Sequence, residues 1–333
     1  MRITCNAAIV AAVAMAAGPS AGRAQAPVTN TEVYLAPFNE QASPPIGLPV
    51  DISNAADYDN QPSFTPDGAS VLFTSKRDRK QTDIYRYDLA TKQLTQLTHT
   101  PESEYSPLVT PDGTGFSVVR VEADNTQRLW RFDLDGTHPR LVLENVKPVG
   151  YHVWIDATHV AVYVLGAGSG DPATLQIVDT TTGASRTVDS GIGHTLVMQR
   201  TPRMVVRRTG QPGDPPVPLL TYVKRVGSRW QFQQVDPARP GVDYQADVQT
   251  AAAVAEDFAL FGVGQTLVPQ GATIQWSNID TIERPEEGYR IDTLERDPAL
   301  AADFTSGPVK NITRLTVSPD GKWIAFVAEP AGK

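Results

Sequence analysis

The sequence predicts an all-β fold, a six-bladed β-propeller built from four-stranded antiparallel blades. Three observations lead to this prediction: a turn motif with a period near 45 residues, a strand motif in phase with it, and two N-terminal strands that complete the last unit. The composition agrees, because 27 prolines in 333 residues exceed the usual share of about 5% and favour a chain with many turns.

A Ser/Thr-Pro-Asp-Gly turn introduces a strand three times. It occurs at 65–68, 110–113 and 318–321, and the first two copies lie 45 residues apart. Proline presets the first corner of such a turn, and glycine takes the positive φ that returns the chain to the next strand. An apolar strand follows each copy, so we assign the aspartates of these motifs to hairpins rather than to catalysis.

A second motif, an apolar strand that ends in aspartate, repeats in phase with the turns. Its copies end at Asp88, Asp133 and Asp179, which are 45 and 46 residues apart. Four short strands in about 45 residues make one propeller blade. Weaker copies bring the number of blades to six.

Two of the weaker copies make up the fourth and fifth blades. The fourth blade is expected to hold a strand pair within 193–206 and outer strands at 219–224 and 228–234. The fifth is expected from 244–263 and 272–279, and the polar segment that follows is expected to contain a helical turn at 298–304.

The N-terminal strands are expected to complete the last blade. The sixth unit has only two strands before Lys333, and segments 31–35 and 49–53 resemble the third and fourth strands of the first blade. Pairing them with the C-terminal strands would close the ring and leave no strand edge open within it.

Residues 1–24 are predicted to be a secretory signal peptide. Arg2 precedes an apolar run at 7–17 that is too short for a hydrocarbon core of ~30 Å, and small residues follow at a cleavage site. The alternative is a buried N-terminal helix. The only cysteine, Cys5, lies before the apolar run, so the processed chain would have no disulfide or thiol. We expect residues 25–333 to form one periplasmic or secreted domain that is monomeric and does not span a membrane.

The charge balance argues against nucleic acid as a partner. The chain has 37 acidic and 29 basic residues, a formal net charge of −8. A phosphate-binding surface needs clustered lysine and arginine.

The two motifs together resemble the WD40-like repeat of the TolB propeller family. The resemblance covers roughly residues 30 to 330 and is clearest in the first, second and sixth units. It implies a periplasmic, non-enzymatic propeller that binds other proteins. TolB-type proteins carry an α/β domain before the propeller, where this sequence has only the predicted signal peptide and a few residues.

The recognition surface is predicted at the mouth of the central channel, where the innermost strands begin. Amide, hydroxyl, imidazole and guanidinium groups at these positions can form directional hydrogen bonds. The predicted binding residues are Asn60, Gln61, Tyr105, Ser106, Tyr151, His152, His194, Thr195, Thr313 and Arg314. Alternatively, these side chains only hold water and neighbouring blades.

Two functions remain open from the sequence. The first is a non-enzymatic scaffold that binds a protein or envelope ligand, without catalytic residues, cofactor or metal; no hydrolase, zinc-peptidase or phosphate-loop motif occurs. The second is a metal-dependent, lactonase-like hydrolase whose ligands converge at the channel mouth. Its candidate ligands are Asn60, Glu104, His152, His194 and Asp247.

Overall fold

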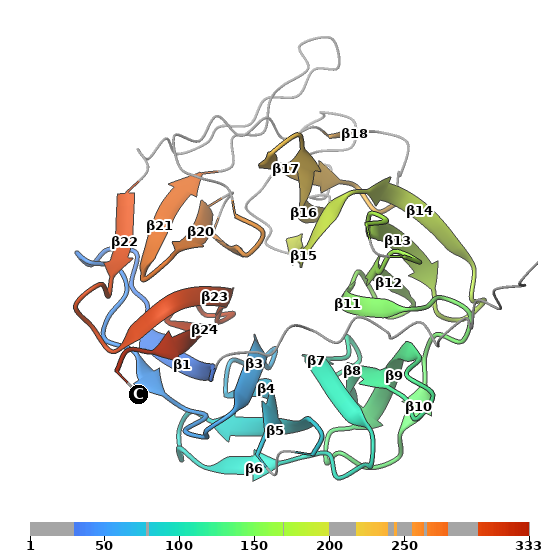
Figure 1. The fold of residues 1–333 in the computed structure, drawn as a ribbon, viewed down its shortest axis with the longest axis horizontal. Coiled ribbons are helices and arrows are strands. Elements are labelled where there is room, and N and C mark those ends of the chain that lie inside the picture. The colour runs from blue at the N-terminus through green and yellow to red at the C-terminus, as the bar shows by residue number, and fades with distance from the viewer. Residues whose placement is uncertain are drawn as a thin grey trace, which may run out of the picture.

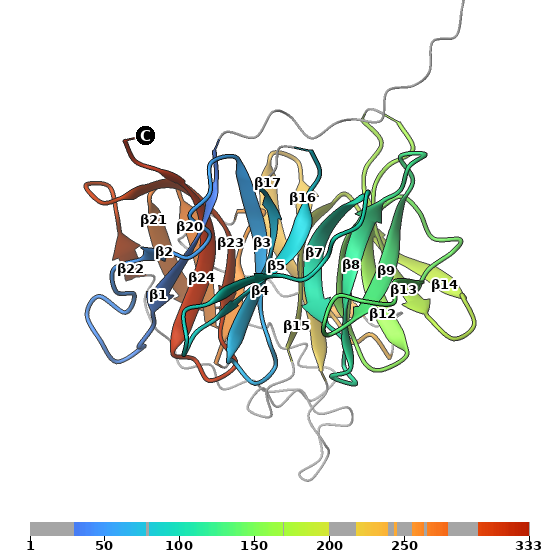
Figure 2. The ribbon, with the colours of Figure 1, turned by 90° about the horizontal axis from the view of Figure 1, so that it is seen from below.

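The computed structural model describes residues 30–77, 80–168, 170–199, 218–238, 243–244, 255–262, 265–278 and 299–332. Over these residues the chain forms six four-stranded antiparallel sheets around a central axis, as predicted (Figure 1). The side view shows the sheets standing as the blades of a ring (Figure 2). The predicted signal peptide lies outside the described residues.

We number the blades in chain order, each from its innermost strand outward. Blade 1 contains β3 (Tyr58–Phe64), β4 (Ser70–Lys76), β5 (Asp83–Asp88) and β6 (Leu94–Gln96). Blade 2 contains β7 (Ser103–Val109), β8 (Gly115–Val121), β9 (Gln127–Asp133) and β10 (Arg140–Leu141). Blade 3 contains β11 (Val149–Trp154), β12 (His159–Val164), β13 (Thr174–Asp179) and β14 (Ser185–Ser190).

The other three blades follow the same order. Blade 4 contains β15 (Ile192–Gln199), β16 (Leu219–Val226), β17 (Arg229–Val235) and β18 (Asp243–Tyr244). Blade 5 contains β19 (Ala259–Phe261), β20 (Gln265–Gln270), β21 (Thr273–Asn278) and β22 (Ala299–Asp303). Blade 6 contains β23 (Val309–Val317), β24 (Trp323–Pro330), β1 (Glu32–Pro37) and β2 (Val50–Asp51).

Blade 6 confirms the predicted closure of the ring by the N-terminal strands. β1 pairs with β24 over six residue pairs, from Glu32 opposite Ala328 to Pro37 opposite Trp323. β2 then pairs with the outer side of β1. The first and last parts of the domain therefore share one sheet.

The apolar core lies between neighbouring blades. One cluster joins Leu72 and Ile84 of blade 1 to Phe116 and Phe132 of blade 2, whose rings stack with centroids 5.5 Å apart. Burying a side chain of this size contributes about 1.5–3 kcal/mol. Packing of this kind holds neighbouring blades together around the axis.

The Pro-Asp-Gly motifs form hairpin turns, as predicted. Gly68, Gly113 and Gly321 have φ values of 70°, 67° and 69°, which glycine adopts without a Cβ penalty. The Asp112 carboxylate accepts hydrogen bonds from Thr110 and Thr114, and the first of these is the main reason that its pKa falls to about 2.

The expected helical turn and the expected assignment of strands in blade 4 were wrong. The segment expected to form a helical turn at 298–304 contains strand β22, because pairing with β21 and burial of Ala301 and Ala302 outweigh the helix propensity of its alanines. The strands expected at the outside of blade 4 are its second and third, β16 and β17, and Tyr244 belongs to this blade. In the described part of the chain, no helix is long and apolar enough to cross a membrane.

Candidate functional site

One residue from each blade lies at an equivalent position near the axis. The first three are spaced by the repeat, 45 residues apart, and the fourth follows 43 residues later. Five belong to the innermost strands, and the sixth, Asp257, lies two residues before β19. We call this set the axial ring: Gln61, Ser106, Tyr151, His194, Asp257 and Arg314.

Three members of the axial ring lie on bulges in the innermost strands. Gln61, Ser106 and Arg314 have φ values of 56°, 53° and 53°, and the register of β3, β7 and β23 shifts at these positions. A left-handed conformation in a residue other than glycine costs about 1–3 kcal/mol and persists only where surrounding contacts determine it. Bulges redirect side chains and are frequent beside functional sites.

Gln61 and Ser106 join blades 1 and 2. The Gln61 Oε1 atom accepts hydrogen bonds from the Ser106 backbone N–H (3.0 Å) and the Thr74 hydroxyl (3.1 Å). Asn60 accepts a hydrogen bond from the Gln61 backbone N–H (2.8 Å). These predicted binding residues therefore already stabilise the junction between blades.

Arg314 crosses the axis of the ring. It comes from β23 of blade 6 and donates a hydrogen bond (2.7 Å) to the hydroxyl of Tyr151 on β11 of blade 3. Its guanidinium carbon also lies 4.9 Å from the centre of the Tyr151 ring, a cation–π distance. β23 and β11 face each other across the middle of the ring (Figure 1). This contact therefore links opposite blades.

Asp257, Glu256 and His194 complete an axial cluster around Arg314 and Tyr151. The Asp257 Oδ1 atom lies 3.3 Å from an Arg314 guanidinium nitrogen and 2.9 Å from His194 Nε2. Glu256 Oε1 lies 2.6 Å from His194 Nδ1, and the imidazole centre is 5.0 Å from that of the Tyr151 ring. The cluster joins blades 3, 4, 5 and 6.

The cluster keeps its charged groups ionised despite burial. Burial alone would raise the pKa of Asp257, but the hydrogen bond with His194 and the charge of Arg314 outweigh it and lower that pKa. Burial would lower the pKa of Arg314, but Tyr151 and Asp257 outweigh it and raise that pKa. The site therefore presents fixed positive and negative groups side by side.

His152 does not belong to the axial cluster, in contrast to its predicted place at the channel mouth. It is 5% exposed, and its Nε2 atom lies 2.7 Å from the hydroxyl of Ser117 in blade 2. Burial lowers the pKa of His152 to about 3. Side chains alternate along a strand, so its neighbour Tyr151 points to the axis while His152 packs between blades 2 and 3.

The other predicted residues lie beside the axial ring. Thr195 and Thr313 are half-buried neighbours of His194 and Arg314. Tyr105 is half-buried, with its ring 6.3 Å from that of Tyr58 and nearly perpendicular to it.

Glu256 and Asp257 were not predicted from the sequence. Blade 5 has no Pro-Asp-Gly turn, so nothing marked the start of its innermost strand. An adjacent pair of acidic residues directly before an apolar segment was the available signal.

The proposed metal ligands do not converge. Glu104 is fully buried beside Thr100 and Arg120, and His152 faces Ser117. Asp247 lies outside the described residues. Among the residues that the structure describes, no group of three or more His, Cys, Asp or Glu is arranged to hold a metal ion.

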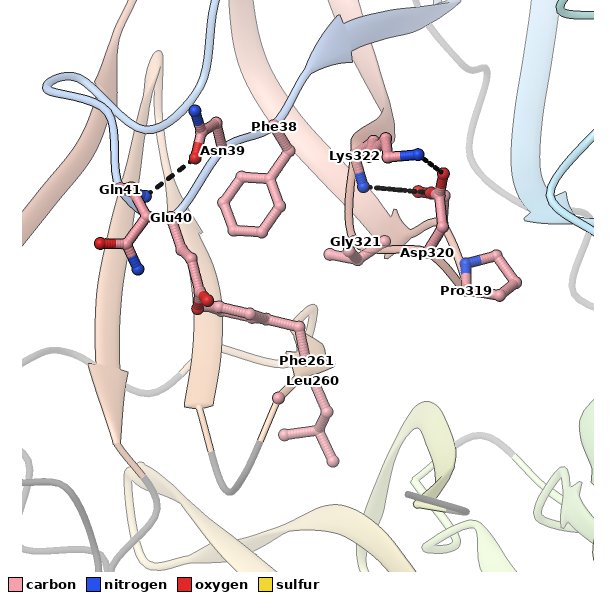
Figure 3. A pocket seen from close by; sticks show the side chains of 13 residues that line it. Phe38, Asn39, Glu40, Gln41, Leu260, Phe261, Pro319, Asp320, Gly321 and Lys322 are labelled. Carbon is pink, nitrogen blue, oxygen red and sulfur yellow. Dashed lines mark hydrogen bonds and ion pairs between the residues drawn. The ribbon is translucent and has the colours of Figure 1, made fainter. Parts of the chain in front are cut away.

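A separate pocket of about 1040 Å³ lies between blades 5 and 6. Its walls include Phe38, Phe261 and Pro319, and Figure 3 shows these residues around the hollow. Lys322 and Asp320 pair with each other at 3.2 Å on its rim. The lining is mixed, because Glu40, Asp320 and Lys322 are charged and Asn39, Gln41 and Ser318 are polar.

Comparison with known proteins supports the fold. The chain is similar to the putative TolB from Agrobacterium tumefaciens, with 14% identity and a TM-score of 0.58, over 90% of this chain and 99% of that one. TolB from Acinetobacter baumannii has 13% identity and a TM-score of 0.49, over 91% of this chain and 64% of that one. A chain of a nidogen/laminin complex has 11% identity and a TM-score of 0.50, over 82% of this chain and 98% of that one. No protein-family model and no curated protein matches the chain. This likeness establishes a propeller fold similar to that of TolB, and it assigns no activity to the chain.

Proposed function

We propose that the protein is an exported, non-enzymatic propeller that binds a protein or envelope ligand at the axial ring. Export is supported by the predicted signal peptide, and protein binding by the resemblance of the repeats to the TolB family. The fold alone would not justify either part of the proposal.

The observation that carries the proposal is the axial cluster. Arg314, Asp257 and Tyr151 bring a guanidinium, a carboxylate and a phenol together from three blades. Charge-assisted hydrogen bonds of this kind are strong and directional. Arg314 also rests on an aromatic ring, and arginine and tyrosine are enriched among residues that dominate binding energies.

The alternative of a metal-dependent hydrolase has less support. Both ring nitrogens of His194 lie against carboxylates, and the cation beside Asp257 is the guanidinium of Arg314. A catalytic metal needs several ligands aimed at one point and an open position for water. The cluster instead resembles a salt-bridge network that a partner can engage from the axis.

Site-specific crosslinking tests the proposal directly. A photoreactive amino acid is placed at Thr195 or Thr313, beside the cluster, and as a control at Thr91, in an exposed turn of blade 1. We expect a crosslinked product of one defined mass from the two axial positions in bacterial envelopes, and none from Thr91. Products from Thr91 alone would place recognition on the rim and contradict the proposal.

A further inference from the structure

Two blade junctions contain the same arrangement of buried carboxyl groups. At the junction of blades 6 and 1, the buried Glu32 of β1 is near enough to Asp59 of β3 to repel its charge. At the junction of blades 1 and 2, the buried Asp83 of β5 repels the charge of Glu104 of β7 in the same way. Asp59 and Glu104 each stand two residues before a member of the axial ring, Gln61 and Ser106.

The hydrogen bonds around the two pairs repeat closely. The Asp59 backbone N–H donates to the Thr31 carbonyl, and that of Glu104 to the Thr82 carbonyl, both at 2.9 Å. In each pair, a hydroxyl group that lies just after the outermost strand of the blade contacts the second carboxylate, that of Glu32 or Asp83. Ser53 Oγ lies 2.8 Å from Glu32 Oε2, and Thr98 Oγ1 lies 3.3 Å from Asp83 Oδ1.

Asp59 and Glu104 are buried, and some of their carboxylate oxygens lack hydrogen bonds that would replace water. Both are 0% exposed. Neither carboxylate oxygen of Asp59 receives a hydrogen bond of ordinary geometry, and Oε2 of Glu104 receives none. Oε1 of Glu104 contacts Thr100 and Arg120. An ionised carboxylate in such a place therefore loses hydration that the protein replaces only in part.

The charged groups around Asp59 come from three strands. Glu32 of β1 and Asp51 of β2 repel its negative charge, while Arg77, next to the end of β4, attracts it and Ser75 of β4 offers partial compensation. Burial is the largest effect, and the pKa of Asp59 rises to about 7.

Glu104 has a similar environment. Asp83 of β5 repels it, and Thr100 and Arg120 of β8 favour its ionised form. Arg120 is shared with Glu102, which contacts it from a more exposed position. Burial again dominates and raises the pKa of Glu104 to about 7.

We propose that these two junctions are pH-sensitive joints, in which each buried carboxyl pair loosens the contact between blades when it loses a proton. One of the joints includes β1, the strand that closes the ring. The inference concerns the junctions and does not depend on what the axial ring binds.

The direction of the effect follows from proton linkage. In the unfolded chain these carboxyl groups ionise near pH 4, whereas in the fold they retain protons up to about pH 7. The folded state therefore binds more protons, and its stability falls as the pH rises through 7. His152 acts in the opposite direction below its ordinary pKa, because it must be neutral in the fold. The test therefore compares variants at each pH.

Urea unfolding at pH 6 and pH 8 tests the proposal with Asp59→Asn and Glu104→Gln. In the wild-type protein, we expect each of the two carboxyl groups to raise the unfolding constant about tenfold between pH 6 and pH 8. Each variant should lack the tenfold rise that its substituted carboxyl group contributes. Glu122→Gln is the matched control, because it removes an ion pair with Arg128 in the same blade but no buried carboxyl pair, and it leaves Arg120 untouched. It should leave the pH dependence unchanged. Equal pH dependence in the wild-type protein and both variants would overturn the proposal.

Hydrogen exchange of the wild-type protein provides a second test that needs no variant. After correction for intrinsic rates, the amides of β1 should lose protection between pH 6 and pH 8 more than those of β12 in blade 3. Parallel loss in the two strands would contradict a joint at the ring closure.

Discussion

At the scale of single residues, the axial cluster depends on the contact between Arg314 and Tyr151. A guanidinium taken from water is costly unless it is paired, and one partially buried carboxylate, shared with His194, supplies only part of that pairing. The tyrosine adds both a hydrogen-bond acceptor and an aromatic face. Arg314 is thereby held across the axis rather than along the wall of its own blade.

Tyr151→Phe distinguishes the contribution of the Tyr151 hydroxyl group to stability from that of its aromatic ring. The variant keeps the cation–π surface and removes the hydroxyl that accepts a hydrogen bond from Arg314, while Asp257 still accepts another. Hydrogen bonds to charged groups contribute roughly 1.5–3 kcal/mol, so we expect urea unfolding to show a loss of about 1–3 kcal/mol. Tyr105→Phe, whose ring is also half-buried at the start of an innermost strand, is the control and should change stability by about 0.5 kcal/mol or less. Equal effects of the two variants would argue against the contact across the axis.

At the scale of strands, the sequence predicted those blades whose turns have strict stereochemical requirements. The Pro-Asp-Gly turns need a glycine at positive φ, so blades 1, 2 and 6 left a clear periodic signal. Blades 4 and 5 lack these turns, and their boundaries were displaced. Asp257 was missed because the fifth blade was expected to begin at Tyr244, which belongs to blade 4. Tyr151, His194 and Arg314 were found.

The orientation of side chains was harder to predict than the strands themselves. Tyr151 and His152 are adjacent in the sequence, and only one can face the axis. The bulges that turn Gln61, Ser106 and Arg314 are produced by pairing with the next strand and have no glycine to mark them. Such tertiary constraints leave little trace in a single sequence.

Deleting residues 27–53 should destabilise the closed ring. The deletion removes β1 and β2 and exposes the edge of β24, whose unpaired N–H and C=O groups invite aggregation. We expect a lower midpoint of thermal unfolding and a smaller soluble fraction. Deleting only residues 27–29, which leaves β1 intact, is the control. A truncated protein that melts with the full-length one would contradict a structural role for the shared blade.

At the scale of the whole molecule, the propeller is a ring whose contacts converge at the axis. The cores between blades hold the innermost strands, and the axial cluster joins four of the six blades. A partner that engages Arg314 would therefore contact several blades through one site. In the proposed function, stability and recognition would be coupled, because the same ion pairs would serve both.

The proposed function requires that Arg314 belong to the recognition site, and capture of the partner by two arginine variants tests this requirement. Wild-type protein, Arg314→Gln and Arg140→Gln are immobilised and exposed to the same bacterial envelope extract. Arg140 is a suitable control because it forms an exposed ion pair with Asp133 near the outer edge of blade 2. Circular dichroism and thermal unfolding first establish that each variant is folded. We predict that the wild-type protein and Arg140→Gln capture the same partner, and that Arg314→Gln captures at least tenfold less, a loss of about 1.4 kcal/mol or more in binding free energy. Undiminished capture by folded Arg314→Gln would contradict the account.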